Sequence, residues 1–84
     1  MVGLAFSAHE HLGDQLLSAY FDWYEACLRL KESYRAWTRA GASKAAYEFR
    51  QCIAALDAEE SAADEYARIA LRVDRRRART KARR

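Results

Sequence analysis

Apolar residues recur through residues 12–37 at the spacing of one face of an α-helix. Successive positions are three or four residues apart, which places their side chains on a single helical stripe. The stripe consists of Leu12, Leu16, Tyr20, Trp23, Cys27, Leu30, Tyr34 and Trp37. Polar residues such as Asp14, Asp22 and Arg29 fall on the opposite side. The pattern predicts one long amphipathic helix over about residues 8–39.

A second stripe with the same period follows after a break at Gly41. Glycine commonly ends a helix because it adopts positive φ without steric cost, and Ser43 is a suitable N-cap for a following helix. The second stripe consists of Ala45, Phe49, Cys52, Leu56, Ala63, Tyr66, Ala70 and Val73. We therefore expect a turn near residues 40–43 and a second helix over about residues 44–74.

The two stripes mirror each other, because the paired position numbers add to 79. Antiparallel helices produce such a mirror, since they advance by equal steps in opposite directions. The pairs include Trp37/Ala42, Leu30/Phe49, Cys27/Cys52, Trp23/Leu56 and Tyr20/Glu59. The fold class is predicted as all-α, with residues 1–74 forming one long antiparallel two-helix hairpin. A single continuous helix in a coiled coil is the alternative.

Two pairs of this mirror suggest particular contacts. Glu59 is predicted to face inward, where a buried carboxylate needs a hydrogen-bond donor, and the Tyr20 hydroxyl is the expected donor. Cys27 and Cys52 are predicted to lie at one level across the hairpin. We expect them to be reduced thiols that act as small apolar side chains, and a disulfide between them is the alternative.

A further apolar row on the first helix points to a partner. It consists of Leu17, Phe21, Tyr24 and Leu28, and Ile53 and Ile69 add apolar area on the second helix. One neighbouring helix cannot cover an arc this wide. We expect a homodimer in which two hairpins form a four-helix bundle, and the alternative is a different helical protein bound to the same surface.

Charge is divided unevenly along the chain. Residues 72–84 contain eight of the fifteen basic side chains but one of the twelve acidic ones, which gives this segment a net charge of +7. Arginine holds phosphate in a bidentate manner, so these residues are candidates for binding DNA or RNA. They are Arg72, Arg75, Arg76, Arg77, Arg79, Lys81, Arg83 and Arg84.

The basic segment over residues 75–84 is expected as a C-terminal tail or as an extension of the second helix. No aromatic residue follows Tyr66, so binding should be electrostatic and tolerant of nucleic-acid sequence. Alternatives are a solubilising tail, or a basic segment that binds an acidic protein or anionic lipid.

Catalytic and metal-binding motifs are missing from the sequence. His9 precedes Cys27 by a stretch of helix about 27 Å long, so the histidines and cysteines cannot form one zinc site. His9 and His11 point to different sides of a helix and cannot hold one ion together. We expect a non-enzymatic protein without metal or cofactor. The N-terminal residues lack a signal sequence and a membrane span, so we expect a cytoplasmic protein with no integral membrane association.

The stretch from Ala36 to Tyr47, with Trp37 and Gly41 at the turn, resembles the small secreted WXG-type hairpins of actinobacteria. The resemblance implies paired hairpins in a four-helix bundle, and secretion. The chain departs from that family twice. Three residues separate Trp37 from Gly41, and Tyr66 is followed four places later by Ala70 instead of the acidic residue of the export signal. Arginine greatly outnumbers lysine, which is typical of GC-rich actinobacterial or phage genomes.

Overall fold

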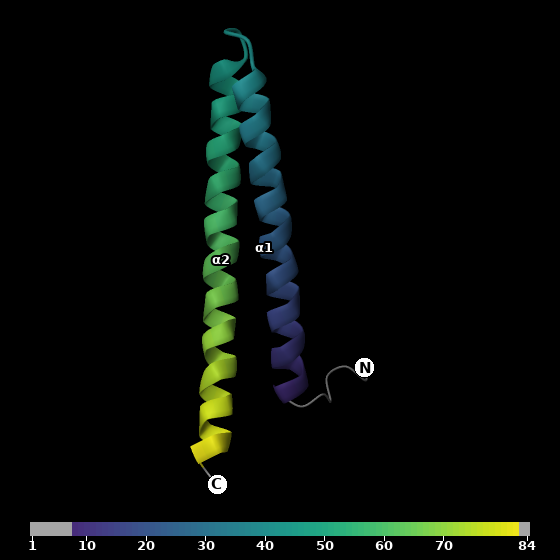
Figure 1. Ribbon diagram of the computed structural model, residues 1–84, viewed down its shortest axis with the longest axis vertical. Helices are drawn as coiled ribbons and strands as arrows, with labels where there is room; N and C mark the ends of the chain where they lie inside the picture. The colour runs from purple at the N-terminus through teal and green to yellow at the C-terminus, as the bar shows by residue number, and fades with distance from the viewer. Residues whose placement is uncertain (1–7, 83–84) are drawn as a thin grey trace.

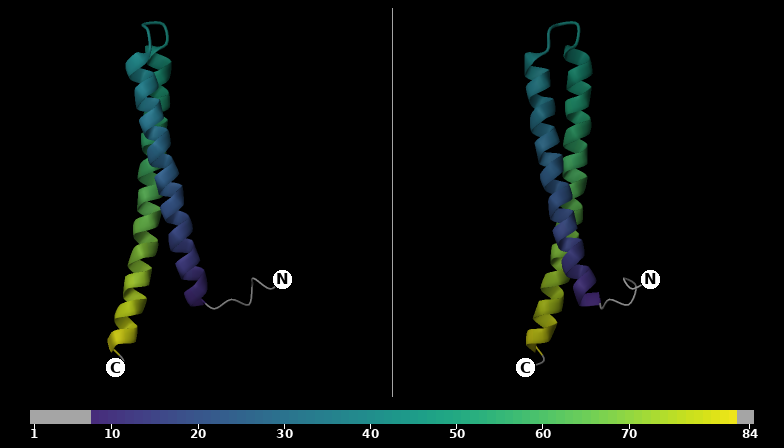
Figure 2. Two further views of the ribbon diagram at one scale, coloured as in Figure 1. Left: turned by 45° about the vertical axis from the view of Figure 1, so that its right-hand side comes forward. Right: turned by 90° about the vertical axis from the view of Figure 1, so that its right-hand side faces the viewer.

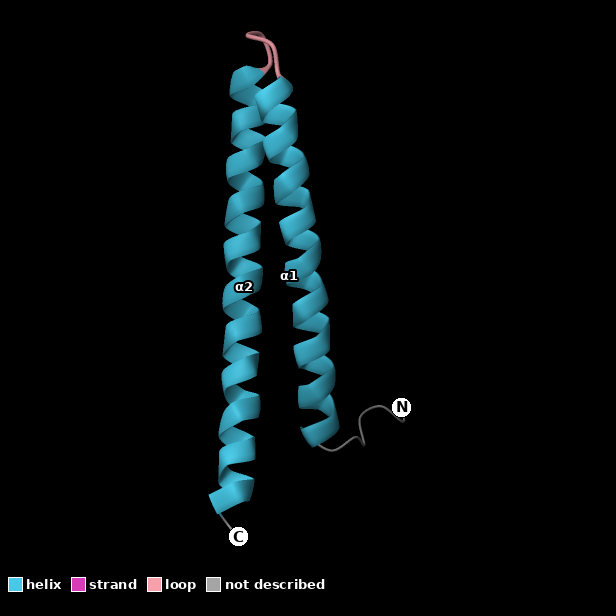
Figure 3. Cartoon of the chain, viewed as in Figure 1, coloured by secondary structure: helices cyan, strands magenta, loops and turns pink. Residues whose placement is uncertain are grey.

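Two long helices make up the fold in a computed structural model that describes residues 8–82 of the chain. Helix α1 spans Ala8–Arg39 and helix α2 spans Ala45–Ala82 (Figure 1). The helices pack against each other and run in opposite directions (Figures 1 and 2). Apart from the short connection, the described chain is entirely helical (Figure 3). The predicted all-α helical hairpin is confirmed, and a single continuous helix is excluded.

The connection over residues 40–44 is held by local backbone hydrogen bonds. The Ala40 amide donates to the Trp37 carbonyl at 3.1 Å, and the Lys44 amide donates to the Gly41 carbonyl at 3.0 Å. Gly41 lies in this connection as expected, but no glycine of the described chain has positive φ. A Cβ atom at Gly41 would meet nothing within 4 Å. The expected left-handed residue at Gly41 is therefore wrong, and two turns closed by hydrogen bonds between residues three apart connect the helices instead.

Helix α2 is the longer element, with 38 residues against 32 in α1. It continues through the basic segment to Ala82 and projects past the start of α1 at the open end of the hairpin (Figure 1). The arginines of this segment are therefore carried on a helix as far as it is described, rather than on a loose tail.

The seam is the line along which the two helices contact each other. It is narrower than the predicted apolar stripe and contains more small residues. The least exposed side chains of α1 are Leu12 at 8%, Ala19 at 5% and Ala26 at 5%, and they recur every seven residues. Small residues at such positions allow close approach of the two backbones. As a result, Tyr20 and Tyr34, which were expected in the stripe, remain 41% and 55% exposed beside the seam.

Aromatic contacts across the hairpin show that the predicted mirror register is wrong. Trp37 packs on Phe49 with 5.0 Å between ring centroids, and Tyr20 packs on Tyr66 at 5.9 Å. The mirror had paired these α1 residues with Ala42 and Glu59. Each contacts α2 roughly two helical turns further along. The connection centres near residue 42 rather than between residues 39 and 40, which accounts for about five residues of this shift toward the C-terminus.

Candidate interaction surfaces

Large apolar side chains remain exposed along one flank of α1. Leu17, Phe21, Tyr24 and Leu28 are 56%, 54%, 51% and 44% exposed. All four were predicted to face a partner, and the structure leaves their surface uncovered. Single exposed apolar residues are ordinary on protein surfaces, but a continuous row is not.

The same face continues onto α2. A shallow groove of about 410 Å³ is lined by residues of both helices, Lys31 and Tyr34 of α1 and Cys52 and Leu56 of α2. The flank of α1 and the flank of α2 that line this groove therefore lie on the same side of the hairpin. Phe49, Ile53 and Leu56 follow each other on α2 at helical spacing and are 43%, 41% and 39% exposed. We define the apolar face as Leu17, Tyr20, Phe21, Tyr24, Leu28, Tyr34, Phe49, Ile53 and Leu56.

Ile69 does not belong to this face, contrary to the sequence prediction. It is 5% exposed and forms the core with Leu12 and Ala19, with Leu16, Tyr66 and Val73 packed around it. The residues of α2 that face α1 follow a seven-residue repeat, so residues 62, 66, 69 and 73 lie on one line along the helix. Ile69 therefore faces α1. A partner cannot reach Ile69 while the hairpin is closed.

The opposite flank of α1 is polar. Gln15, Ser18, Asp22, Glu25 and Arg29 lie there and are exposed. Glu25 and Arg29 form an exposed ion pair of 3.8 Å across one helical turn. The flank of α1 opposite the exposed apolar row is therefore polar.

Tyr20 joins the rings of the apolar face into one cluster. Its ring lies 5.7 Å from Phe21 and 6.4 Å from Tyr24, measured between centroids. Across the seam, Trp23 stacks on Tyr66 at 5.7 Å. Aromatic pairs at these distances add to the free energy of packing beyond the area they bury. They hold part of the exposed surface in place.

Glu59 receives its hydrogen bond from a different donor than predicted. The Trp23 indole Nε1–H donates to the Glu59 Oε2 atom at 2.8 Å, and both side chains are half-buried. The predicted donor, Tyr20, lies beside Tyr66 instead. Tyr66 is roughly two turns further along α2 than Glu59. This polar contact within the seam fixes which residues of the two helices lie opposite each other.

Loss of the Trp23–Glu59 hydrogen bond should lower the free energy of unfolding. A double-mutant cycle of Trp23→Phe and Glu59→Leu separates the bond from the lost ring area, and we expect a coupling energy of about 1 kcal/mol. Urea unfolding followed by circular dichroism measures it. Tyr20→Phe is the matched control, since it removes only the hydroxyl. A larger coupling of Glu59 with Tyr20 than with Trp23 would contradict the assignment.

The two cysteines lie one on each helix, and the shifted register places Cys27 level with positions of α2 beyond Cys52. Both are free and half-buried. Cys52 lies with Leu30, Tyr34 and Leu56 at the groove of the apolar face, and Cys27 does not line that groove. The predicted level pairing of Cys27 and Cys52 fails for the same reason as the rest of the mirror.

Four arginines gather at the open end of the hairpin. Arg72, Arg75, Arg76 and Arg79 line a hollow of about 250 Å³ together with Leu12 of α1. The Nη1 atom of Arg76 is buried there and has no hydrogen-bond partner among the described residues. A guanidinium with unused donors inside a cationic hollow favours an anion as its partner. We call these four residues the arginine cluster.

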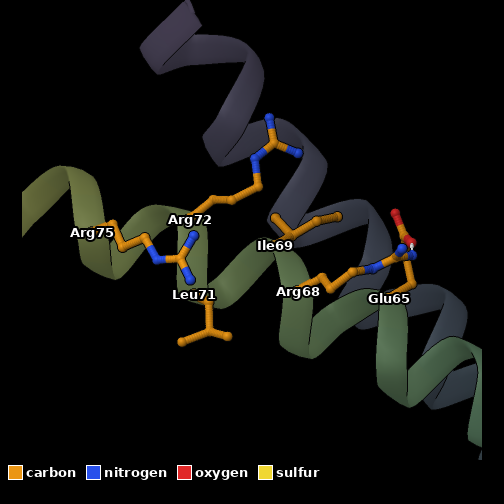
Figure 4. A pocket seen from close by; sticks show the side chains of 6 residues that line it. All are labelled: Glu65, Arg68, Ile69, Leu71, Arg72 and Arg75. Atoms are coloured by element: carbon orange, nitrogen blue, oxygen red, sulfur yellow. Dashed lines mark hydrogen bonds and ion pairs between the residues drawn. The ribbon is translucent and has the colours of Figure 1, made fainter.

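The charges next to the arginine cluster leave it positive. Arg68 pairs with Glu65 on α2, whereas Arg72 and Arg75 extend from the helix without an ion pair (Figure 4). In the same view Ile69 and Arg72 point toward α1, and Leu71 points away. Within the described part of the chain, no carboxylate forms an ion pair with any arginine of the cluster.

The remaining predicted phosphate-binding residues lie further along α2. Arg77 is exposed and is not part of the hollow. Lys81 lies on the helix, but its side chain is outside the described residues, as are Arg83 and Arg84. Sequence reasoning named the arginines but missed the contribution of Leu12, because only the register of the two helices brings it to the hollow.

Two kinds of feature do not occur among residues 8–82. No group of three or more His, Cys, Asp or Glu side chains gathers there in a way that could hold a metal ion. Neither α1 nor α2 offers an apolar stretch long enough to cross a bilayer.

Comparisons with known proteins give no relative for this chain. It matches no protein-family profile, and no curated protein and no solved structure is significantly similar to it.

Proposed function

We propose that this hairpin is a non-enzymatic scaffold that pairs with a second copy through the apolar face and binds nucleic-acid phosphates through its arginine-rich end. The observation that carries the proposal is the division of the molecule: an uncovered apolar face along its body and four unpaired arginines gathered at one end.

Pairing is supported by the thinness of the molecule. Its smallest dimension is 13 Å, close to the ~10–12 Å diameter of one helix. Stable domains bury their apolar surfaces between at least two layers, and this hairpin supplies one. A second hairpin against the apolar face would complete a four-helix bundle.

The surface area of the hairpin supports the same arrangement. Its accessible surface is 6956 Å², whereas a compact protein of its mass exposes roughly 5,100 Å². The excess exceeds the roughly 800 Å² that each partner buries in a standard interface. The elongated hairpin therefore exposes more surface than a compact chain of its mass, and pairing would cover part of it.

Phosphate binding is supported by the arrangement of the arginine cluster. Arg72, Arg76 and Arg79 recur at steps of four and three along a continuous helix, so they form a ridge that can follow a phosphate backbone. None of the described residues after Tyr66 on α2 is aromatic, so the ridge itself offers no ring on which a base could stack. The expected contacts are to phosphates, and binding should not depend on base sequence.

Binding that depends on phosphate contacts must weaken steeply with salt. We expect nuclease-treated protein to bind a labelled DNA duplex at about 50 mM salt and to release it at about 300 mM. Fluorescence anisotropy with two duplexes of unrelated sequence measures this. Equal affinity at both salt concentrations, or no binding at either, would contradict the proposed function.

The exposed apolar face also favours a second candidate, an adaptor or inhibitor that binds another helical protein. In that case the isolated chain would remain a monomer and bind no nucleic acid. The same anisotropy titration, combined with the mass of the protein in solution, distinguishes the two candidates.

A further inference from the structure

We infer that the hollow of the arginine cluster is a discrete site for one doubly charged phosphate group, which Arg76 binds through its buried nitrogen. Such a group is either the terminal phosphate of a nucleic-acid strand or a free phosphate ion, since the two share this chemistry. The inference rests on the proposed phosphate binding and adds a defined site to it. It does not require that two hairpins pair.

Arg76 occupies a position that is apolar elsewhere along the seam. The residues of α2 that face α1 recur at steps of four and three, and the step after Ile69 and Val73 reaches Arg76. Its neighbours in sequence, Arg75 and Arg77, are exposed, whereas Arg76 is half-buried. The apolar seam is thus followed by a guanidinium that points between the helices.

The Arg76 side chain lacks the acceptor that such a position requires. Its Nη1 atom is buried and has no hydrogen-bond partner among the described residues. A guanidinium only donates hydrogen bonds and keeps its charge in a protein, so it needs an acceptor. Buried donors without acceptors are rare in folded proteins because they lower stability. An anion in the hollow would supply the acceptor.

The lining of the hollow suits a small and highly charged group. Its volume of about 250 Å³ is below the ~300–1,000 Å³ of typical small-molecule sites, so it fits one compact group rather than a nucleoside. Four arginines and Leu12 line it, without an aromatic ring or a carboxylate. Guanidinium groups bind phosphate oxygens in pairs. The lining therefore favours a phosphate over a nucleobase or a cation.

Charge and access favour a terminal or free phosphate over a phosphate within a strand. An internal phosphate carries one negative charge and is tied to sugars on both sides. A phosphate with one ester bond carries about 1.5–2 negative charges at pH 7 and has three free acceptor oxygens. Duplex DNA is also stiff, so its internal phosphates cannot bend into a hollow between two helices. A terminal or free phosphate can enter, and it offsets more of the repulsion among the four arginines.

The exposed arginines on either side of Arg76 keep their role in backbone binding. Arg72 and Arg79 lie about one helical turn before and after Arg76, and both are exposed. With a strand end in the hollow, these two side chains can contact the phosphates that follow it. The ridge then binds the backbone while Arg76 binds the end.

The site is formed by both helices, so its ligand should stabilise the closed hairpin. Leu12 belongs to α1 and the arginines belong to α2, and a ligand that binds only the folded state raises its stability. Thermal unfolding followed by circular dichroism tests this with inorganic phosphate at about 50 mM against chloride of equal ionic strength. We expect the midpoint to rise by a few degrees in phosphate.

Two variants separate the site from the general stabilising effect of phosphate on proteins. Arg76→Gln should lose most of the rise in midpoint. Arg77→Gln removes the same charge from an exposed position outside the hollow and should keep the rise. An equal rise in both variants and the unaltered protein, or no rise in any of them, would overturn the inference.

Two duplexes that differ only in a 5′-phosphate identify the source of the phosphate. If a strand end is the ligand, fluorescence anisotropy should give about tenfold higher affinity for the phosphorylated duplex, the gain from one further charge-assisted hydrogen bond. Arg76→Gln should abolish this preference. Equal affinities, with the Arg76-dependent rise in midpoint retained, would assign the hollow to free phosphate. Binding of neither duplex would contradict the proposed function, and the unfolding measurement would still decide on the site.

Discussion

Replacing Phe21 and Tyr24 by glutamate is expected to convert the paired protein into single hairpins. Both side chains are more than half exposed in the hairpin, so the fold should survive their replacement. In the dimer they lie in the interface, where each buried aromatic ring contributes on the order of 1.5–3 kcal/mol and a carboxylate without a partner opposes burial. The dissociation constant should rise at least a hundredfold. Sedimentation velocity over a range of protein concentrations measures the change.

A matched pair of substitutions on the other face controls for added charge. Gln15→Glu and Ser18→Glu add the same two negative charges to α1, on its polar flank. We expect this variant to pair as the unaltered protein does. If both variants dissociated equally, the apolar face would not be the interface, and overall charge would account for the effect.

Replacing Arg72, Arg76 and Arg79 by glutamine should remove most binding to nucleic acid while the hairpin remains folded. The three side chains form the ridge on α2, and none has an ion pair with another described residue that its loss would break. Each lost phosphate contact lowers the slope of log affinity against log salt by about 0.9, so three should lower it by about 2.7 per hairpin. Anisotropy titrations at several salt concentrations measure the slope.

Three arginines away from the ridge provide the control for this variant. Arg29→Gln, Arg39→Gln and Arg50→Gln remove the same charge from exposed positions elsewhere on the hairpin. Their slope should change much less than that of the ridge variant. Equal losses in the two variants would mean that net charge alone attracts nucleic acid, and the arginine cluster would then have no special role.

The helical hairpin was predictable because its signal is periodic and long. Two stretches with apolar residues at every third or fourth position, divided at Gly41, leave few alternatives to a pair of antiparallel helices. The register was not predictable in the same way. Ala19 and Tyr20 are neighbours in sequence, and both continue the apolar period. Choosing the larger residue for the seam was wrong, because close packing of two long helices selected the alanine.

The parts of the candidate surfaces that are formed by one helix were predictable from the sequence. The parts that depend on how the two helices are aligned were not. Leu17, Phe21, Tyr24 and Leu28 form a row that is visible in α1 alone. Ile69 was misplaced because its surroundings are set by Leu12 on the other helix. The Trp23–Glu59 hydrogen bond and the hollow of the arginine cluster also require the register. The error in register hid both from the sequence.

The mass of the nuclease-treated chain in solution tests the central claim most directly. Sedimentation equilibrium at about 300 mM salt, where contacts to phosphates are weak, reports on the apolar face without contribution from nucleic acid. Pairing through that face predicts twice the 9.7 kDa mass of one chain. A mass of 9.7 kDa at every accessible protein concentration would contradict the claim and leave the apolar face to a different protein.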